Sequence, residues 1–188
     1  GDFIGIAPEE MLRILRLILR VEPLDSLLSR IASTISANFG IRALTICVLD
    51  EEAGYFRPRV VRGFPEDQTK AISNHAYTLE RKRDELDEKF RIEHNCYYVR
   101  PEGLTHVYND DVDYIQDLSE LKRPRESVEE WHDLDYIDFI MTDRIGNWIG
   151  WIEIDEPVDK KAPSRKTIEK IHVLSELAAI AIENSKIF

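Results

Sequence analysis

The chain has 188 residues, of which 43% are hydrophobic and 32% charged, and its formal net charge is −11. This length and apolar content suit one globular domain, alone or with an appendage. The acidic balance argues against a nucleic-acid-binding surface, which requires clustered Lys and Arg. The basic runs Arg81-Lys82-Arg83 and Lys122-Arg123 lie beside acidic residues, and we expect them to form solvated faces.

The two cysteines, Cys47 and Cys96, are too few for a disulfide scaffold and favour a reducing compartment, so we expect a cytoplasmic protein. No run of the sequence reaches the roughly 18 apolar residues of a membrane helix, and no secretory signal is visible. The chain begins at Gly1 without a methionine, which suggests a piece of a longer protein.

Helical periodicity opens the chain. Pro8 to Val21 carries a broad apolar stripe opposite its arginines, and Leu24 to Asn38 carries a second stripe. Pro23 interrupts the pattern between them. We therefore expect residues 1–22 to form an N-terminal linker or signalling helix and residues 23–188 to form the main domain.

From Ile41 the pattern changes to that of β-strands. Ile41 to Leu49 and Tyr55 to Phe64 are rich in strand-forming residues and predict a hairpin. Pro58 is expected at a sheet edge or a bulge, because proline cannot donate a hydrogen bond within a central strand. A short helix is expected from Pro65 to Ile72.

The middle of the chain, His75 to Asp135, is less regular. It predicts a charged helix over Arg81 to Phe90, a short strand over His94 to Val99 and a short helix around Val112 to Leu121. Irregular segments of this length are usually functional loops or disordered regions. The density of Tyr, Trp and Ile favours an ordered segment.

Two apolar strands and a long helix close the chain. Tyr136 to Thr142 and Trp148 to Asp155 predict a second hairpin, with one face more buried than the other. Ser164 suits the N-cap of a helix that runs to the end of the chain. This helix carries two apolar stripes, so it needs two partners: the sheet, and either the other terminal helices or a second subunit. Hairpins between terminal helices predict an α+β fold with an antiparallel sheet.

The ordered motifs of the chain resemble those of a GAF domain. They are Gly146-Asn-Trp-Ile-Gly150, Ile152-Glu-Ile-Asp-Glu-Pro157, Ala162-Pro-Ser164 and Leu177-Ala-Ala-Ile-Ala-Ile-Glu-Asn184, preceded by Leu24-Asp-Ser-Leu-Leu28, Phe39-Gly40 and Arg62-Gly-Phe64. The resemblance covers about Leu24 to Phe188, and the ordered set is more specific than any one motif. It implies a central antiparallel sheet with the terminal helices on one face and an irregular ligand-pocket segment on the other.

The resemblance also implies a function. GAF domains serve as inputs to histidine kinases, cyclases, phosphodiesterases or transcription regulators, and they often pair through their terminal helices. We expect a small-molecule sensing and signal-relay domain attached to an output domain, most simply in a sensor histidine kinase, with no membrane insertion by this segment. A homodimer is expected through Leu177, Ile180 and Ile187. A structural dimerisation module with a vestigial pocket, or a haem or redox sensor, is the alternative.

The candidate ligand contacts are aromatic, polar and charged residues of the middle segment. Aromatic rings with a polar tip suit small-ligand sites, and an arginine can receive an anionic group. The candidates are Tyr97, Tyr98, Arg100, Trp131, His132 and Asp135. The aromatic residues suit packing on the sheet almost as well, and Arg100 suits a surface ion pair.

The sequence offers less support for a cofactor site or a catalytic site than for ligand binding. His94 and Cys96 carry side chains that ligate haem and metals, but their spacing matches no zinc signature, and structural roles are the alternative. The sequence has no Gly-rich phosphate loop, nucleophile elbow or His-Glu-x-x-His motif. We therefore expect a regulatory domain without its own catalytic site and with no required cofactor.

Overall fold

The computed structural model describes residues 5–19, 23–103 and 124–186. Its elements, in chain order, are α1 (Pro8–Leu19), α2 (Leu24–Phe39), β1 (Ile41–Asp50), β2 (Tyr55–Arg62), α3 (Glu66–Ser73), α4 (Leu79–Glu85), η1 (Glu88–Phe90), β3 (Arg91–Glu93), β4 (Cys96–Val99), η2 (Pro101–Gly103), β5 (Tyr136–Thr142), β6 (Trp148–Pro157) and α5 (Arg165–Ser185). No helix in the described ranges is long and apolar enough to cross a membrane.

One six-stranded sheet, in the order β2-β1-β6-β5-β4-β3, forms the centre of the molecule, and all its neighbouring strands are antiparallel. The two predicted hairpins, β1–β2 and β5–β6, join through β1 and β6. Pro58 lies on the edge strand β2, opposite Cys47, where the register shifts, as its sequence predicts. Gly150 is required on β6, because a Cβ there would lie 2.3 Å from the carbonyl oxygen of Cys47.

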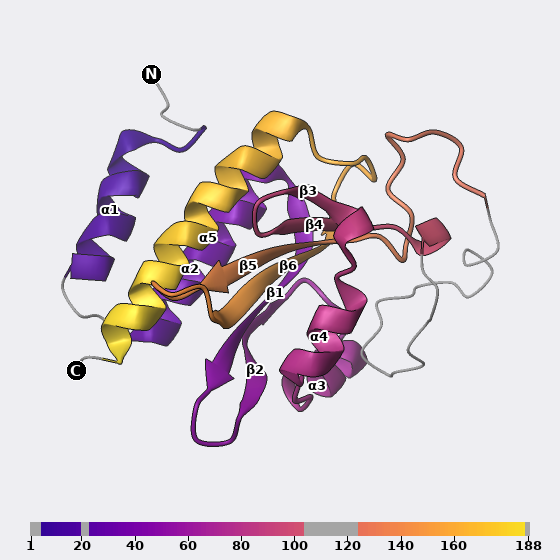
Figure 1. Cartoon of the computed structure of the whole chain (residues 1–188). Coiled ribbons are helices and arrows are strands. Elements are labelled where there is room, and N and C mark those ends of the chain that lie inside the picture. The colour runs from indigo at the N-terminus through magenta and orange to yellow at the C-terminus, as the bar shows by residue number, and fades with distance from the viewer. Residues whose placement is uncertain (1–4, 20–22, 104–123, 187–188) are drawn as a thin grey trace.

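The helices α2 and α5 pack on one face of the sheet, and α1 packs on these two helices; the three are called the helix layer below (Figure 1). The N-cap prediction for α5 is confirmed, because the Ser164 hydroxyl accepts a hydrogen bond from the backbone N–H of Thr167 at 3.2 Å. Ile14 of α1 is fully buried in the same core as Leu174 of α5. The helix α1 therefore packs on the domain, and a boundary at residue 22 stays a prediction.

The other face of the sheet is covered by α3, α4 and η1 (Figure 1). A second apolar cluster lies beneath them: Cys47, Phe56, Leu86, Phe90, Val99, Ile140 and Trp151. Asp138 and Trp151 on this face are as completely buried as Ile137 and Ile152 on the helix-layer face. Tyr136 and Glu153 on this face are only partly buried, whereas Met141 and Ile154 toward the helix layer are buried. The expectation that one face of the β5–β6 hairpin is more buried than the other is therefore confirmed.

The described part of the middle segment, residues 75–103 and 124–135, contains one strand more than its sequence pattern indicates. The predicted helix over Arg81 to Phe90 is replaced by the shorter α4 and by η1, and α4 begins after Thr78, whose hydroxyl accepts a hydrogen bond from the N–H of Arg81. The unpredicted strand β3 pairs with β4 across a turn at Asn95, whose φ of 59° suits a tight turn. The helix expected around Val112 to Leu121 lies outside the described residues. The predicted α+β fold, with an antiparallel sheet and terminal helices on one face, is confirmed.

Candidate functional site

Most of the predicted ligand contacts gather around one buried carboxylate, Asp135. The Arg125 guanidinium binds both of its oxygens, at 2.6 and 2.7 Å, and also binds Glu102 at 2.9 Å. The Tyr98 hydroxyl and the backbone N–H of His132 donate to the same carboxylate, each at 3.1 Å. These five residues are called the Asp135 cluster, and Arg125 and Glu102 are the two members that the sequence did not predict.

The neighbours of the Asp135 cluster also have defined partners. Trp131 donates its indole N–H to the backbone carbonyl of Asp155 at 3.1 Å, and Arg100 lies over the Tyr98 ring and donates to the carbonyl of Val128. Hydrogen bonds to Asp135 raise the pKa of Arg125, so the guanidinium stays charged. Because the Asp135 carboxylate already accepts four hydrogen bonds, it has little capacity left for a ligand. The cluster links η2 and residues 125–135 to β4.

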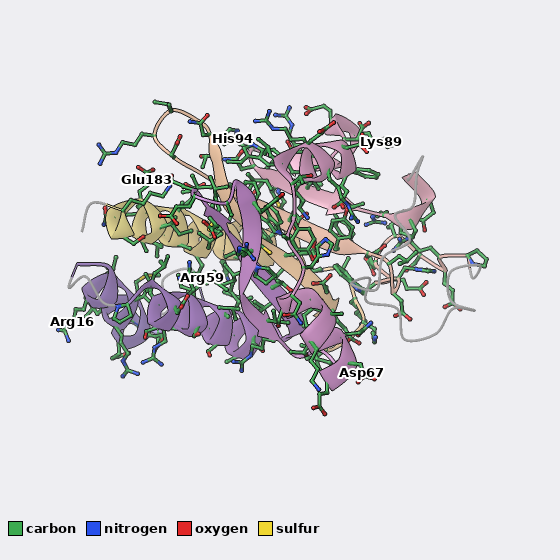
Figure 2. The ribbon with its side chains drawn as sticks, turned by 90° about the horizontal axis from the view of Figure 1, so that it is seen from below. Arg16, Arg59, Asp67, Lys89, His94 and Glu183 are labelled. Carbon is green, nitrogen blue, oxygen red and sulfur yellow. The ribbon has the colours of Figure 1, made fainter. Side chains whose placement is uncertain are left out.

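The structure separates the remaining predicted site residues. Tyr97 lies on the opposite face of β4 from Tyr98, against the cluster under α4 and η1. Cys96 is buried in the helix-layer core, whereas His94 is exposed at the β3–β4 turn (Figure 2). Among the described residues, no three His, Cys, Asp or Glu side chains are placed to hold a metal ion.

The dimer residues predicted on the last helix differ in exposure. Ile180 is 49% exposed, whereas Leu177 packs partly against the helix-layer core. Ile187 lies outside the described residues. Of the two that the structure describes, Ile180 is the one whose side chain is exposed enough to contact a partner.

A second polar group is buried on the face of the sheet beneath α4. Lys82 is 2% exposed, and its Nζ lies 2.6 Å from Asp138 Oδ2, 3.2 Å from Glu153 Oε1 and 3.6 Å from Glu85 Oε2. Nζ also lies 4.6 Å from the ring centroid of Trp151 and 5.4 Å from that of Tyr136. The six residues Lys82, Glu85, Tyr136, Asp138, Trp151 and Glu153 are called the Lys82 site.

Local sequence rules place each side chain of this site. Leu79, Lys82 and Leu86 recur at helical spacing, so the lysine lies on the face of α4 that packs on the sheet. Alternation along β5 and β6 directs Asp138 and Glu153 to that same face, while their neighbours Ile137 and Ile152 enter the helix-layer core. The long lysine side chain therefore meets two carboxylates over the middle of the sheet.

Electrostatics favour a charged lysine. Burial by itself lowers the pKa of Lys82, but the carboxylates of Asp138, Glu153 and Glu85 outweigh burial and raise it. Asp155, next to Glu153 on the same face of β6, has a raised pKa because it is buried and because Glu153 is close. We therefore expect Asp155 to carry a proton and Lys82 a positive charge at neutral pH.

The Lys82 site is less fully bonded than the Asp135 cluster. Within the described ranges, Asp138 Oδ1 and Asp155 Oδ2 are buried oxygens with no hydrogen-bond donor. Such groups are rare in folded proteins and call for an explanation. Glu153 and Glu85 keep 24% and 16% of their side chains exposed, so the site reaches solvent at its rim. Aromatic walls, buried charge and a solvent-facing rim are features of a small-molecule site.

The expectation that Lys82 lies on a solvated face is wrong, because its side chain is 2% exposed. Arg83 is exposed and fits the expectation, whereas Arg81 is partly buried. Two signals pointed to the buried site: Lys82 in helical phase with Leu79 and Leu86, and Asp138 inside an otherwise apolar strand. The second basic run, Lys122-Arg123, lies outside the described residues.

Solved structures with the same fold were found. The GAF domain/HD domain protein from Geobacter sulfurreducens has a TM-score of 0.63 at 13% identity, over 91% of this chain and 99% of that chain. Residues 122 to 287 of a methyl-accepting chemotaxis protein have a TM-score of 0.59 at 14% identity, over 96% and 99%. A domain assigned to a two-component sensor histidine kinase from Sinorhizobium meliloti 1021 has a TM-score of 0.57 at 12% identity, over 88% and 94%.

Sequence comparisons do not add to this result, since no family model and no curated protein matches the chain. The structural matches establish the fold, and the chain has the fold of GAF domains.

Proposed function

We propose that this chain is the small-molecule sensing and signal-relay domain of a larger signal-transduction protein, most simply a sensor histidine kinase. The observation that carries the proposal is that one sheet lies between the Lys82 site and the helix layer. A ligand at the Lys82 site would contact β5 and β6, and α5 packs on the opposite face of both strands. A ligand that shifts these strands can thereby bias the position of α5.

Two further observations support a regulatory role inside the cell. The structural neighbours include a domain assigned to a sensor histidine kinase and a fragment of a chemotaxis protein, both from signalling systems. Cys47 and Cys96 are both buried and unpaired, which suits a reducing compartment such as the cytoplasm. We infer a domain that regulates an attached output domain and has no catalysis of its own.

Hydrogen–deuterium exchange on Lys82→Met tests the relay. Methionine retains an unbranched side chain one heavy atom shorter than that of lysine but has no ammonium group, so Asp138 loses its ion partner. We expect faster exchange in α4 and a changed exchange rate in α5, across the sheet. Lys89→Met, at an exposed position, is the matched control and should leave α5 unchanged (Figure 2). An effect confined to α4 contradicts the relay.

A second candidate function is a structural dimerisation module whose pocket is filled by Lys82. Apolar side chains that project from the helix layer favour it: Ile180 and Val173 on α5 are 49% and 38% exposed, and Leu12 on α1 is 52% exposed. Exposed apolar residues that gather on one layer suit a protein interface. In this reading the homodimer forms through α1 and α5.

Light scattering on Ile180→Asp tests the dimer. A buried aspartate at the interface would prevent pairing, so the measured mass should fall from that of a dimer to that of a monomer. Ile145→Asp, at an 84% exposed position between β5 and β6, is the control and should keep the dimer mass. A wild-type protein of monomer mass, or a variant that stays dimeric, contradicts this interface.

A further inference from the structure

The Lys82 site surrounds an ammonium group with the two kinds of partner that recognise ammonium ligands, carboxylates and aromatic rings. Nζ of Lys82 contacts Asp138 and Glu153 at 2.6 and 3.2 Å and lies 4.6 Å from the Trp151 ring centroid. Desolvated aromatic rings bind alkylammonium cations through their negative faces. The ammonium that occupies this cage belongs to the protein itself.

The charge of the site selects a cation over an anion. One ammonium group faces carboxyl groups of Asp138, Glu153 and Glu85, with Asp155 beside them. An anionic ligand would meet like charges at close range. Asp138 Oδ1 and Asp155 Oδ2, which are buried and have no donor among the described residues, can accept further N–H groups. A positively charged hydrogen-bond donor therefore fits the site.

The contact at Lys82 also controls how α4 is held. This helix has seven residues, which is too short for a helix to be stable by itself in water. Leu79, Lys82 and Leu86 are its side chains that pack toward the sheet. Loss of the central ion contact would leave the two leucines and two peripheral contacts, Glu85 with Tyr136 and Arg83 with Trp148, to hold the helix. Occupation of the site and the position of α4 are therefore coupled.

We propose that the Lys82 site binds the primary ammonium group of a small amine, and that Lys82 is its internal occupant when no amine is bound. The amine replaces Nζ of Lys82 beside Asp138 and frees α4 from the sheet. The inference rests on the sensing function proposed above, since it names the class of ligand and the segment that responds. A tethered competitor acts at an effective concentration on the order of mM, so simple amines bind the wild type weakly.

Lys82→Ala provides the direct test, because the atoms it removes, three methylene groups and an ammonium, correspond to propylammonium. Thermal unfolding of the variant is measured in propylammonium chloride, in 1-propanol and in sodium propionate. We expect a saturable rise in the unfolding midpoint with propylammonium and much smaller changes with the alcohol and the anion. Wild type should need at least about tenfold more amine for the same rise, because Lys82 competes.

Two controls locate the effect at the cage. Lys82→Ala with Asp138→Asn removes the closest carboxylate charge and should lose most of the response to propylammonium. Lys89→Ala removes an exposed lysine close by in the chain and should respond as weakly as wild type (Figure 2). Equal rises with propylammonium and 1-propanol in Lys82→Ala, or equal rises in Lys82→Ala and Lys89→Ala, overturn the proposal.

Poor folding of Lys82→Ala does not prevent the test. If the variant is unfolded alone, propylammonium has to refold it, as judged by near-UV circular dichroism, while 1-propanol and propionate do not. A variant that stays unfolded in all three solutions contradicts the proposal. Lys82→Met refills the cage with an uncharged chain, so its unfolding midpoint should not respond to propylammonium, and a response equal to that of Lys82→Ala also counts against the site.

Hydrogen exchange separates this inference from the proposed function. If propylammonium binds Lys82→Ala but hydrogen exchange in α5 does not change, the ammonium site is supported and the relay is contradicted. If Lys82→Met changes hydrogen exchange in α5 but Lys82→Ala binds no amine, the relay is supported and the ammonium site is contradicted.

Discussion

The two faces of the central sheet bury the same strands in different ways. Toward the helix layer, Ile137 and Ile152 pack with other apolar side chains, and close packing stabilises this contact. Toward α4, Asp138 and Glu153, their immediate neighbours in the chain, surround the ammonium of Lys82. The stability of the first face depends on the volume of its side chains, whereas that of the second also depends on which charges are present.

The largest expected effect is at the charged face. Asp138→Ala leaves the buried Lys82 ammonium without its closest carboxylate, and removal of one partner of a buried ion pair costs about 3–5 kcal/mol of unfolding free energy. Adding Lys82→Met removes the uncompensated charge and should restore most of the loss. Urea unfolding of the single and double variants measures both values. A double variant as unstable as Asp138→Ala would show that shape, and not charge, governs this face.

The helix-layer face should respond in the opposite manner. Leu174→Ala leaves a cavity under α5, where the side chain is fully buried, and should cost about 3 kcal/mol. The loss should be the same at pH 5 and at pH 8, because the described core around Leu174 is apolar. Val173→Ala, at the adjacent and 38% exposed position, should change the unfolding free energy by less than about 1 kcal/mol. A pH-dependent loss in Leu174→Ala would break the contrast between the faces.

The sequence predicts one face much better than the other. The apolar periodicity of Leu24 to Asn38, the two hairpins and the Ser164 cap were enough to place α2, the central strands and α5, since each depends on neighbours within a few residues. The contact between Lys82 and Asp138 joins segments far apart in the chain, and no local rule pairs them. Because Lys82 stands between Arg81 and Arg83, the sequence pattern is that of a solvated basic run and does not indicate a buried lysine.

The predicted site shows the same limit. The aromatic candidates Tyr98 and Trp131 are both buried. They belong to the core on the helix-layer side of the sheet, where Tyr98 donates to Asp135, and not to the Lys82 site on the opposite face. Strand alternation separates Tyr98 from Tyr97, so a run of neighbouring aromatics lines two different faces. Residue type indicated that these aromatic side chains line a pocket or pack on the sheet. The face that each one joins depends on its position along the strand.

The smallest expected effect concerns how pH distinguishes the two faces. Burial, together with Glu153, raises the pKa of Asp155, so the folded protein holds a proton that the unfolded chain releases above about pH 4. This contribution to stability is complete below that pH and is lost as pH rises toward the raised pKa of the folded state. Asp155→Asn carries no titrating group, so its urea midpoint should fall less than that of wild type between pH 5 and pH 8.

The exposed Asp159, four residues along the chain, supplies the matched control, and Asp159→Asn should keep the wild-type slope. Parallel pH profiles for wild type and Asp155→Asn would mean that Asp155 is ionised in the folded state. The excess negative charge next to Lys82 would then be larger, and the charged face would attract a cation more strongly.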